Sequence, residues 1–195
     1  PSRVVLALAL AVALAGPAGA RAGRPPGPRD QAAATAGTVT AVVGARVLTG
    51  TGAEIDNGVV LIEGARIKAV GPAAAVPVPP GARVIDAAGR VVTPGFVDSH
   101  SHLGLGASGD VTEDNEMSNP VTPELRIIDS IHPEGMGPDA GQFRRALAEG
   151  VTTVVARPGS GNVIGGQSAV LKLRGGTVDD MVILFPADMK MALGR

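Results

Sequence analysis

The chain contains no cysteine, tryptophan or tyrosine, and phenylalanine occurs only three times. Without cysteine there is neither a disulfide nor a thiolate metal site. The scarcity of aromatic rings argues against stacking platforms for single-stranded nucleic acid and against aromatic cages for cations. An excess of positive charge is missing as well, because 17 Lys and Arg residues face 18 Asp and Glu residues, for a net charge of −1. The sequence therefore predicts no nucleic-acid partner.

Hydrophobic residues make up 45% of the 195 residues, which is enough for a packed core and excludes global disorder. This length accommodates one domain or two small ones. A complete (β/α)₈ barrel takes about 250 residues, so we expect at most part of one in this chain.

Residues 1–20 have the pattern of a secretory signal peptide. Arg3 precedes an apolar run over residues 4–15, which Gly16-Pro17 end before the small residues Ala18-Gly19-Ala20. The run is too short to cross a bilayer as a helix. We expect cleavage, a secreted or periplasmic location and no stable membrane anchor afterwards. An uncleaved anchor or a buried helix is the alternative.

Residues 21–37 are rich in Pro, Gly and Ala, and this composition predicts a flexible linker. Residues 38–93 follow with short β-branched and apolar runs separated by glycine and proline turns. This spacing favours the N-terminal part of a small β-sandwich. Asn57-Gly58 is a two-residue turn signal, and we expect a hairpin turn there.

The C-terminal half of the chain has alternating helical and β patterns. The sequence predicts a helix at Gln142–Glu149 that stops at Gly150. The apolar run Val151–Ala156 then predicts a buried parallel strand. Helix, glycine and buried strand form the repeating step of an α/β architecture. A further short helix is expected within residues 120–131, with Thr122 as its cap.

Two histidines one residue apart are the most informative feature of the sequence. His100 and His102 follow a Pro-Gly turn at the end of a predicted strand, where residues two apart share a face. Two neutral imidazoles side by side can bind one divalent ion, so both are predicted metal ligands. Asp98 shares this face and is predicted to orient an imidazole or hold the strand end, with a role as a direct ligand as the alternative. The third histidine, His132, is predicted to be an ordinary loop residue.

The run VVTPGFVDSHSHLGLG resembles the first barrel strand of the amidohydrolase superfamily, and more closely its imidazolonepropionase-like and prolidase-like branch. The resemblance covers roughly residues 40–195 and includes VTTVVARPGSGNVIGGQSAVLKL. It implies an α/β fold, in which a partial small β-sandwich precedes a metal-dependent hydrolase (β/α)₈ TIM barrel. Residues 94–195 would hold the first strands and helices of that barrel, which is truncated in this chain. The resemblance also implies that His100 and His102 bind a divalent metal, usually zinc, and leaves one or two ions open.

The further ligands in this family come from later strands and are a Lys (often carboxylated) or Glu in some members, followed by two His. An Asp on the last strand is the general base, and no residue after His102 can be matched to any of them. We therefore expect the general base beyond Arg195 and no activity from this chain alone. The implied reaction is attack of metal-activated water on a C–N bond of a small dipeptide-like or cyclic amide substrate, with deamination as an open variant. The alternative is a small secreted β-rich domain without enzyme activity that binds metal or a partner. The sequence leaves the oligomeric state open.

Two loops after predicted strands would lie at the catalytic rim of such a barrel. In the glycine-rich loop of residues 157–167, Asn162 and Gln167 are predicted substrate contacts. Residues 104–141 carry eight acidic residues against one arginine. This charge fits either an acidic lid that favours cationic substrates or an ordinary solvated loop.

Overall fold

The computed structural model describes residues 6–8, 39–105, 107–108, 111–112, 115–133, 141–174 and 176–193, with the backbone alone at 6–8, 107–108 and 111–112. Apart from the short strand β1 (Leu6–Leu8), the predicted signal peptide and linker lie outside these residues. The chain divides into two compact units, and among the described residues the division lies between Gly95 and Phe96. No helix within the described ranges has the length and apolar character needed to cross a membrane.

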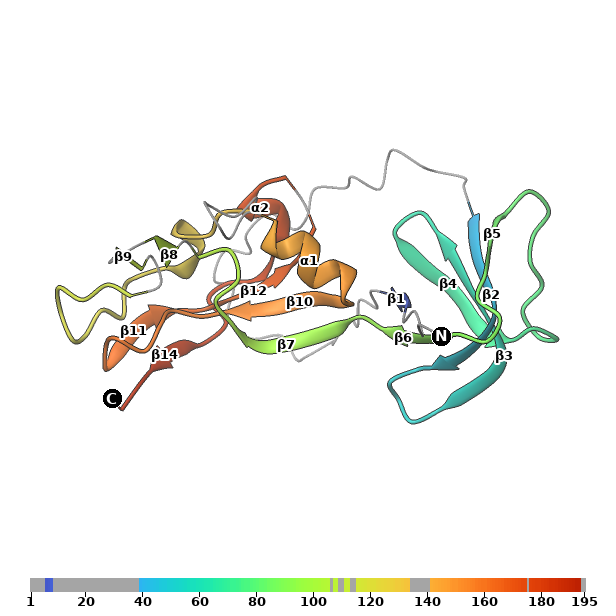
Figure 1. Ribbon diagram of the computed structural model, residues 1–195, viewed down its shortest axis with the longest axis horizontal. Helices are drawn as coiled ribbons and strands as arrows, with labels where there is room; N and C mark the ends of the chain where they lie inside the picture. The colour runs from blue at the N-terminus through green and yellow to red at the C-terminus, as the bar shows by residue number, and fades with distance from the viewer. Residues whose placement is uncertain are drawn as a thin grey trace, which may run out of the picture. The chain divides into compact units, whose positions relative to one another are not determined.

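The described residues of the first unit form one six-stranded sheet in the order β1-β6-β2-β3-β4, with β5 also pairing with β2 (Figure 1). Strand β2 pairs antiparallel with β3 along one edge and parallel with β5 and β6 in succession along the other. The part of the predicted sandwich segment that the structure describes is therefore a single sheet. Its strands after β1 are β2 (Val39–Leu48), β3 (Glu54–Glu63), β4 (Arg66–Pro72), β5 (Arg83–Asp86) and β6 (Val91–Pro94).

Strands β2 and β3 carry apolar side chains on both faces. Ala41 pairs with Leu61, and both belong to one buried cluster. The next pair, Val42 and Val60, belongs to another. Because successive side chains of a strand point to opposite faces, this sheet buries a small core on each side.

The predicted turn at Asn57-Gly58 is wrong, because both residues lie inside β3. Asn57 has a φ of 48°, and the pairing with β2 shifts register on both sides of Ala45. A Cβ at Gly58 would lie 2.6 Å from Cγ2 of Val47. The Asn-Gly pair thus accommodates a bulge-type irregularity in a long strand instead of reversing the chain. The chain reverses at Gly64, whose φ is 58°.

The second unit contains a four-stranded mixed sheet in the order β13-β12-β10-β7. The chain passes from β7 (Phe96–Ser101) through α1 (Gln142–Ala148) to β10 (Val151–Ala156), which lies parallel to β7. The predicted helix and the predicted parallel strand are both confirmed. Strand β12 (Ala169–Lys172) pairs antiparallel with β10, and β13 (Val182–Leu184) pairs antiparallel with β12.

The core of this unit lies where α1 covers the sheet (Figure 1). Val154 of β10 pairs with Leu171 of β12, and both side chains are fully buried. Phe143 of α1 and Met181 belong to the same apolar cluster. Val154 sits in a run buried on both faces, as expected for an inner parallel strand.

The remaining elements are short. A two-stranded sheet joins β11 (Ile164–Gln167) and β14 (Met189–Met191), another joins β8 (Ala107–Ser108) and β9 (Val111–Thr112), and α2 (Val178–Met181) precedes β13. The short helix expected within residues 120–131 is a 3-10 turn at Ile127–Asp129. The prediction of Thr122 as its cap is wrong, because Arg126 precedes this turn and the Thr122 hydroxyl donates to the Ile164 carbonyl at 3.0 Å.

Candidate functional site

The two predicted metal ligands lie together at the C-terminal end of β7. His100 is within the strand and His102 directly follows it. Both side chains are exposed, and their ring centroids are 5.3 Å apart with the ring planes at 62°. Ser101, between them, is buried, and its hydroxyl accepts from the Leu103 amide at 3.1 Å. The alternation of the strand therefore presents two imidazoles on one surface and anchors the residue between them.

The hydrogen bond of His102 fixes its tautomer. Its Nδ1 lies 2.9 Å from the carbonyl oxygen of Arg157, which directly follows β10. A carbonyl oxygen only accepts, so Nδ1 carries the proton and donates it. The lone pair of the neutral ring is therefore on Nε2, the arrangement that metal-binding histidines adopt when a carbonyl holds the other nitrogen.

His100 faces the ammonium group of Lys190. The distance from Lys190 Nζ to His100 Nε2 is 3.5 Å. The pKa of His100 lies below its usual range, first because the ring is partly desolvated and then because of the positive charges of Lys190, His102 and Arg157. The negative charge of Asp98 raises the pKa of His100, but this effect is weaker than the others. The neutral imidazole, which is the metal-binding form, is thus favoured.

Asp98 contacts the backbone of the strand end. Its Oδ1 accepts from the His100 amide at 3.0 Å. This contact corresponds to one of the two roles predicted for Asp98, that of holding the strand end, although its importance for metal binding stays a prediction.

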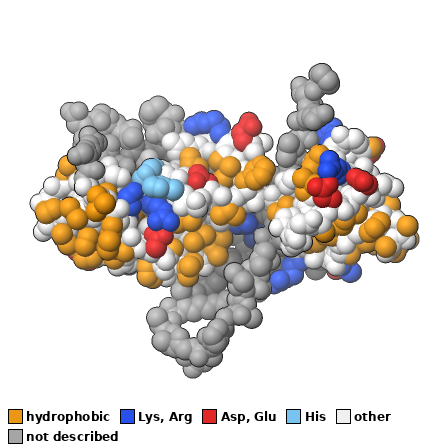
Figure 2. All heavy atoms as spheres, turned by 90° about the horizontal axis from the view of Figure 1, so that it is seen from below, with side chains coloured by type: hydrophobic (Ala, Val, Ile, Leu, Met, Phe, Trp, Pro, Cys, Tyr) orange, Lys and Arg blue, Asp and Glu red, His pale blue; other side chains and the backbone are white. Residues whose placement is uncertain are grey.

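Arg157 connects the end of β10 to the His-bearing strand. Its Nε donates to the Ser99 carbonyl at 3.2 Å, and its amide donates to the Ser101 carbonyl at 3.0 Å. The guanidinium pairs with Asp188, with Nη1 at 3.0 Å from Oδ1 and Nη2 at 2.7 Å from Oδ2. Such a two-pronged pair is the strongest geometry available to an arginine and a carboxylate. The space-filling view shows histidine side chains at the surface with basic and acidic side chains beside them (Figure 2).

The predicted substrate contacts lie in the glycine-rich loop and its strand, and both bind the chain's own backbone. Asn162 is buried, and its Nδ2 donates to the carbonyls of Glu116 and Asn119. Gln167, in β11, donates from Nε2 to the Pro123 carbonyl at 3.2 Å. These amides hold the segment that precedes the 3-10 turn, and their contact with substrate stays a prediction.

His100 and His102 have the side chains of metal ligands, but two ligands do not complete a metal site. Zinc sites use three or four protein ligands. Within the ranges that the structure covers, no group of three or more His, Asp or Glu side chains is placed to hold a metal ion. The two imidazoles, one with its tautomer set, suit a divalent ion but supply only two of the three or four protein ligands of a zinc site.

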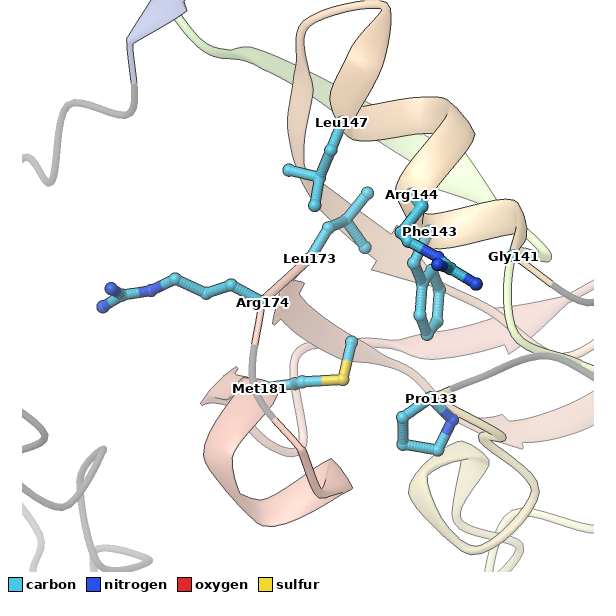
Figure 3. Close-up of a pocket in the computed structure, with 8 residues that line it drawn as sticks. All are labelled: Pro133, Gly141, Phe143, Arg144, Leu147, Leu173, Arg174 and Met181. Atoms are coloured by element: carbon cyan, nitrogen blue, oxygen red, sulfur yellow. The ribbon is translucent and has the colours of Figure 1, made fainter.

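A separate cavity of about 270 Å³ lies between α1, the end of β12 and Met181 of α2 (Figure 3). Phe143, Leu147 and Leu173 give it an apolar lining, and the Arg174 side chain extends away from it. None of the predicted site residues lines this cavity.

Sequence reasoning missed Lys190, Arg157 and Asp188. Each is an isolated charged residue in an otherwise unremarkable local pattern, and only the pairing of β14 with β11 and of β10 with β7 brings them to the histidines. The one available signal is Met189-Lys190-Met191, in which the charged residue takes the inward position of a strand.

Comparison with known proteins identifies relatives of this chain. A family model described as "Amidohydrolase family" matches residues 83–122, which include both histidines. An amidohydrolase of Hapsidospora irregularis is 38% identical over 116 residues, covering 57% of this chain and 11% of that protein. An imidazolonepropionase of Streptomyces griseus is 30% identical over 139 residues, covering 67% of this chain and 35% of that protein.

A solved structure agrees with these matches. The amidohydrolase from Thermotoga maritima MSB8 superposes with a TM-score of 0.70 at 34% identity, covering 80% of this chain and 39% of that one. The chain spans between 11% and 35% of the length of the two relatives named above. The predicted resemblance is confirmed, and the chain belongs to the amidohydrolase superfamily.

Proposed function

We propose that this chain contributes the first two metal ligands of a hydrolase that cleaves a C–N bond in a small molecule. The observation that carries the proposal is the His102 hydrogen bond to the Arg157 carbonyl, because it places the lone pair of the neutral ring on Nε2 while the ring lies beside that of His100. Relatives named as an amidohydrolase, an imidazolonepropionase and a 5-methylthioadenosine/S-adenosylhomocysteine deaminase support C–N chemistry as the class.

The described residues of this chain have distinct roles in the proposed hydrolysis. His100 and His102 would hold the ion, which we propose to be zinc because imidazole suits it and the chain has no thiolate. When bound, such an ion supplies Lewis acidity toward a carbonyl group and an activated water. Asp98 holds the strand end through the His100 amide, and the Arg157 carbonyl keeps the His102 proton on Nδ1. The lowered pKa of His100 favours the neutral form of that ring, which is the metal-binding form.

We further infer that β7 and β10 begin a barrel that continues outside the described residues. The two strands are parallel and joined through α1, as consecutive barrel strands are. Strand β7 is at the edge of its sheet, and its side chains Phe96 and Val97 are 50% and 64% exposed. An apolar edge strand of this kind calls for a further strand or helix to cover it. The parallel step also disfavours the alternative of a small β-rich binding domain.

The proposal is tested with the full-length protein on a panel of N-acyl amino acids, cyclic amides and aminopurines. We expect turnover of at least one class by the zinc-loaded protein, none after chelation, and loss of turnover in His102→Ala. The matched control is His132→Ala, which removes a histidine from a loop and should leave turnover unchanged. Equal turnover in the chelated protein, or in His102→Ala, would contradict the proposal.

A further inference from the structure

Residues 115–126, which we call the strap, lie along the glycine-rich loop of residues 157–167 (Figure 1). Glycines of the loop make this close approach possible. A Cβ at Gly161 would lie 2.7 Å from an oxygen atom of the strap, and one at Gly166 would lie 2.6 Å from another. Both distances are far shorter than a van der Waals contact, so larger residues would push the strap away. The glycines of this loop therefore serve the packing of the strap.

Polar contacts hold the strap on the loop. Asn162 of the loop is 4% exposed, and its Nδ2 donates to the backbone carbonyls of Glu116 and Asn119. A side-chain amide has two N–H donors, and these two carbonyls occupy both. The Thr122 amide adds a backbone hydrogen bond to the Ile164 carbonyl at 2.9 Å. Asn162 therefore fastens the first half of the strap, and we call its two contacts the latch.

The strap buries little apolar surface. All side chains of residues 116–121 are exposed, with Met117 at 70% and Val121 at 45%. Thr122 is the one buried residue of the strap. A segment that is held by hydrogen bonds and has few buried apolar contacts opens at a low free-energy cost, while the core stays folded. We therefore expect the strap to leave the loop in a local opening.

Apolar residues anchor the chain on both sides of the strap. Ile127 follows the strap directly and Leu105 precedes it, and both are buried in the core cluster of the second unit, as is Ile131. Leu105 and Ile131 form an isolated bridge, and the Leu105 amide donates to the His102 carbonyl at 3.2 Å. The segment is therefore fixed at its base beside His102 when the strap opens.

The glycine-rich loop connects the strap to the His102 ring. The loop begins at Arg157, whose carbonyl oxygen accepts from His102 Nδ1 at 2.9 Å. Strand β10 ends at Ala156 and β11 begins at Ile164, so the stretch between them lacks the support of a strand ladder. Contacts with the strap supply part of that support, and their loss gives the Arg157 carbonyl more freedom.

We propose that docking of the strap and orientation of the His102 ring are coupled. While the latch is closed, the loop holds the Arg157 carbonyl against Nδ1, and release of the latch frees both the carbonyl and the ring. Asn162 is then a positioning residue that acts on His102 through Arg157. Because coupling is reciprocal, a metal ion on His102 also favours the docked strap, a consequence that rests on the proposed function.

The first test is amide hydrogen exchange in the metal-free, full-length protein. The Thr122 and Ile164 amides report on the strap, and the Leu173 amide, which donates to the Thr152 carbonyl at 3.0 Å, reports on the core. We expect the strap amides to exchange faster than Leu173. Asn162→Asp should accelerate them by about 5- to 30-fold, as loss of two hydrogen bonds does, and leave the Leu173 rate unchanged. Asn162→Ala, which adds no charge, should behave alike.

Asn119→Asp is the matched control. Oδ1 of Asn119 accepts from the Val121 amide at 3.0 Å, and a carboxylate accepts in the same way, so an identical change of charge keeps this contact. Exchange of Thr122 and Leu173 at one common rate in the unaltered protein would show that the strap does not open by itself. Equal acceleration in Asn162→Asp and Asn119→Asp would show that Asn162 is not the latch. Either result would overturn the inference.

The second test follows the His102 ring by nitrogen NMR in the metal-free protein, at a pH where the ring is neutral. We expect the proton on Nδ1 in the unaltered protein and in Asn119→Asp, and a mixture of both tautomers in Asn162→Asp. A contact that only stabilised the strap would not change this signal. Unchanged His102 signals in a variant whose strap amides exchange faster would therefore refute the coupling.

Zinc separates this inference from the proposed function. Zinc should slow exchange of the Thr122 amide in the unaltered protein, and Asn162→Asp should lower zinc affinity, since the coupling acts in both directions. Zinc that binds without slowing this exchange would overturn the coupling and leave the hydrolase standing. A protein that binds no zinc would contradict the proposed function, whereas the metal-free exchange rates and ring signals would still decide the role of Asn162.

Discussion

Replacing Asp188 by asparagine should weaken zinc binding at the His pair without unfolding the protein. The carboxylate of Asp188 holds the Arg157 guanidinium through two contacts, at 3.0 and 2.7 Å. The same arginine supplies, through its carbonyl, the acceptor that fixes His102 Nδ1 at 2.9 Å. Without the negative charge the guanidinium is less firmly held, the carbonyl gains freedom, and the His102 ring loses part of its orientation.

The expected loss of zinc affinity depends on how exposed the Arg157 and Asp188 side chains are. A hydrogen bond to a charged group contributes about 1.5–3 kcal/mol. The side chains of Arg157 and Asp188 are 24% and 40% exposed. Solvent screening therefore reduces the contribution of their pair to about 1 kcal/mol. This corresponds to about a fivefold change in a binding constant. Direct loss of the hydrogen bond to a metal-binding histidine costs about 10- to 100-fold, so a fivefold loss is reasonable for a residue acting through Arg157.

The assay is competition for zinc between the full-length protein and a chromogenic chelator. Asp188→Asn, Arg157→Gln and the double variant form a cycle, and the double variant should lose no more affinity than Arg157→Gln alone, because both changes break one contact. Glu54→Gln is the control, since it breaks an arginine–carboxylate pair with Arg46 in the first unit. Unchanged affinity in Asp188→Asn, or fully additive losses in the double variant, would refute the reasoning.

Two further predictions concern protonation and stability. The NMR-monitored pKa of His100 should lie below the usual histidine value and should rise in Lys190→Met, because the ammonium is one cause of the depression. Because the folded-state pKa is the lower one, the stability linked to His100 is present above the unfolded pKa and is lost as the pH falls through the folded pKa. A His100 pKa that is unchanged in Lys190→Met would show that the two groups are not close. Leu171→Ala should cost about 2–5 kcal/mol in the free energy of unfolding, because this side chain is fully buried. In contrast, Leu193→Ala should be nearly neutral, because Leu193 is exposed, and similar denaturation midpoints for the two variants would contradict the described core.

Features set by short stretches of sequence were predictable. The helix before Gly150 and the strand Val151–Ala156 follow from local periodicity and a glycine stop, and both are found. The shared surface of His100 and His102 follows from strand alternation. The fold class was predictable to the level of a mixed α/β chain, because the same local signals specify its elements.

Features set by pairing between distant segments were not predictable. Asn57-Gly58 has the composition of a tight turn, but pairing of β3 with β2 along its whole length makes it a strand irregularity. Lys190 and Asp188 reach the site only because β14 pairs with β11, far from β7 in the sequence. Asn162 is a polar residue in a glycine-rich loop, and this local pattern suits a substrate contact as well as it suits a structural contact. Its burial against backbone carbonyls depends on the course of the preceding loop.

The metal content of the full-length protein tests the central claim most directly. Protein purified without chelators is analysed by mass spectrometry of its metals, beside His100→Ala/His102→Ala and the control His132→Ala. The account predicts stoichiometric zinc in the unaltered protein and in His132→Ala, and a large loss in the double variant. Equal metal content in all three proteins would show that His100 and His102 are not metal ligands.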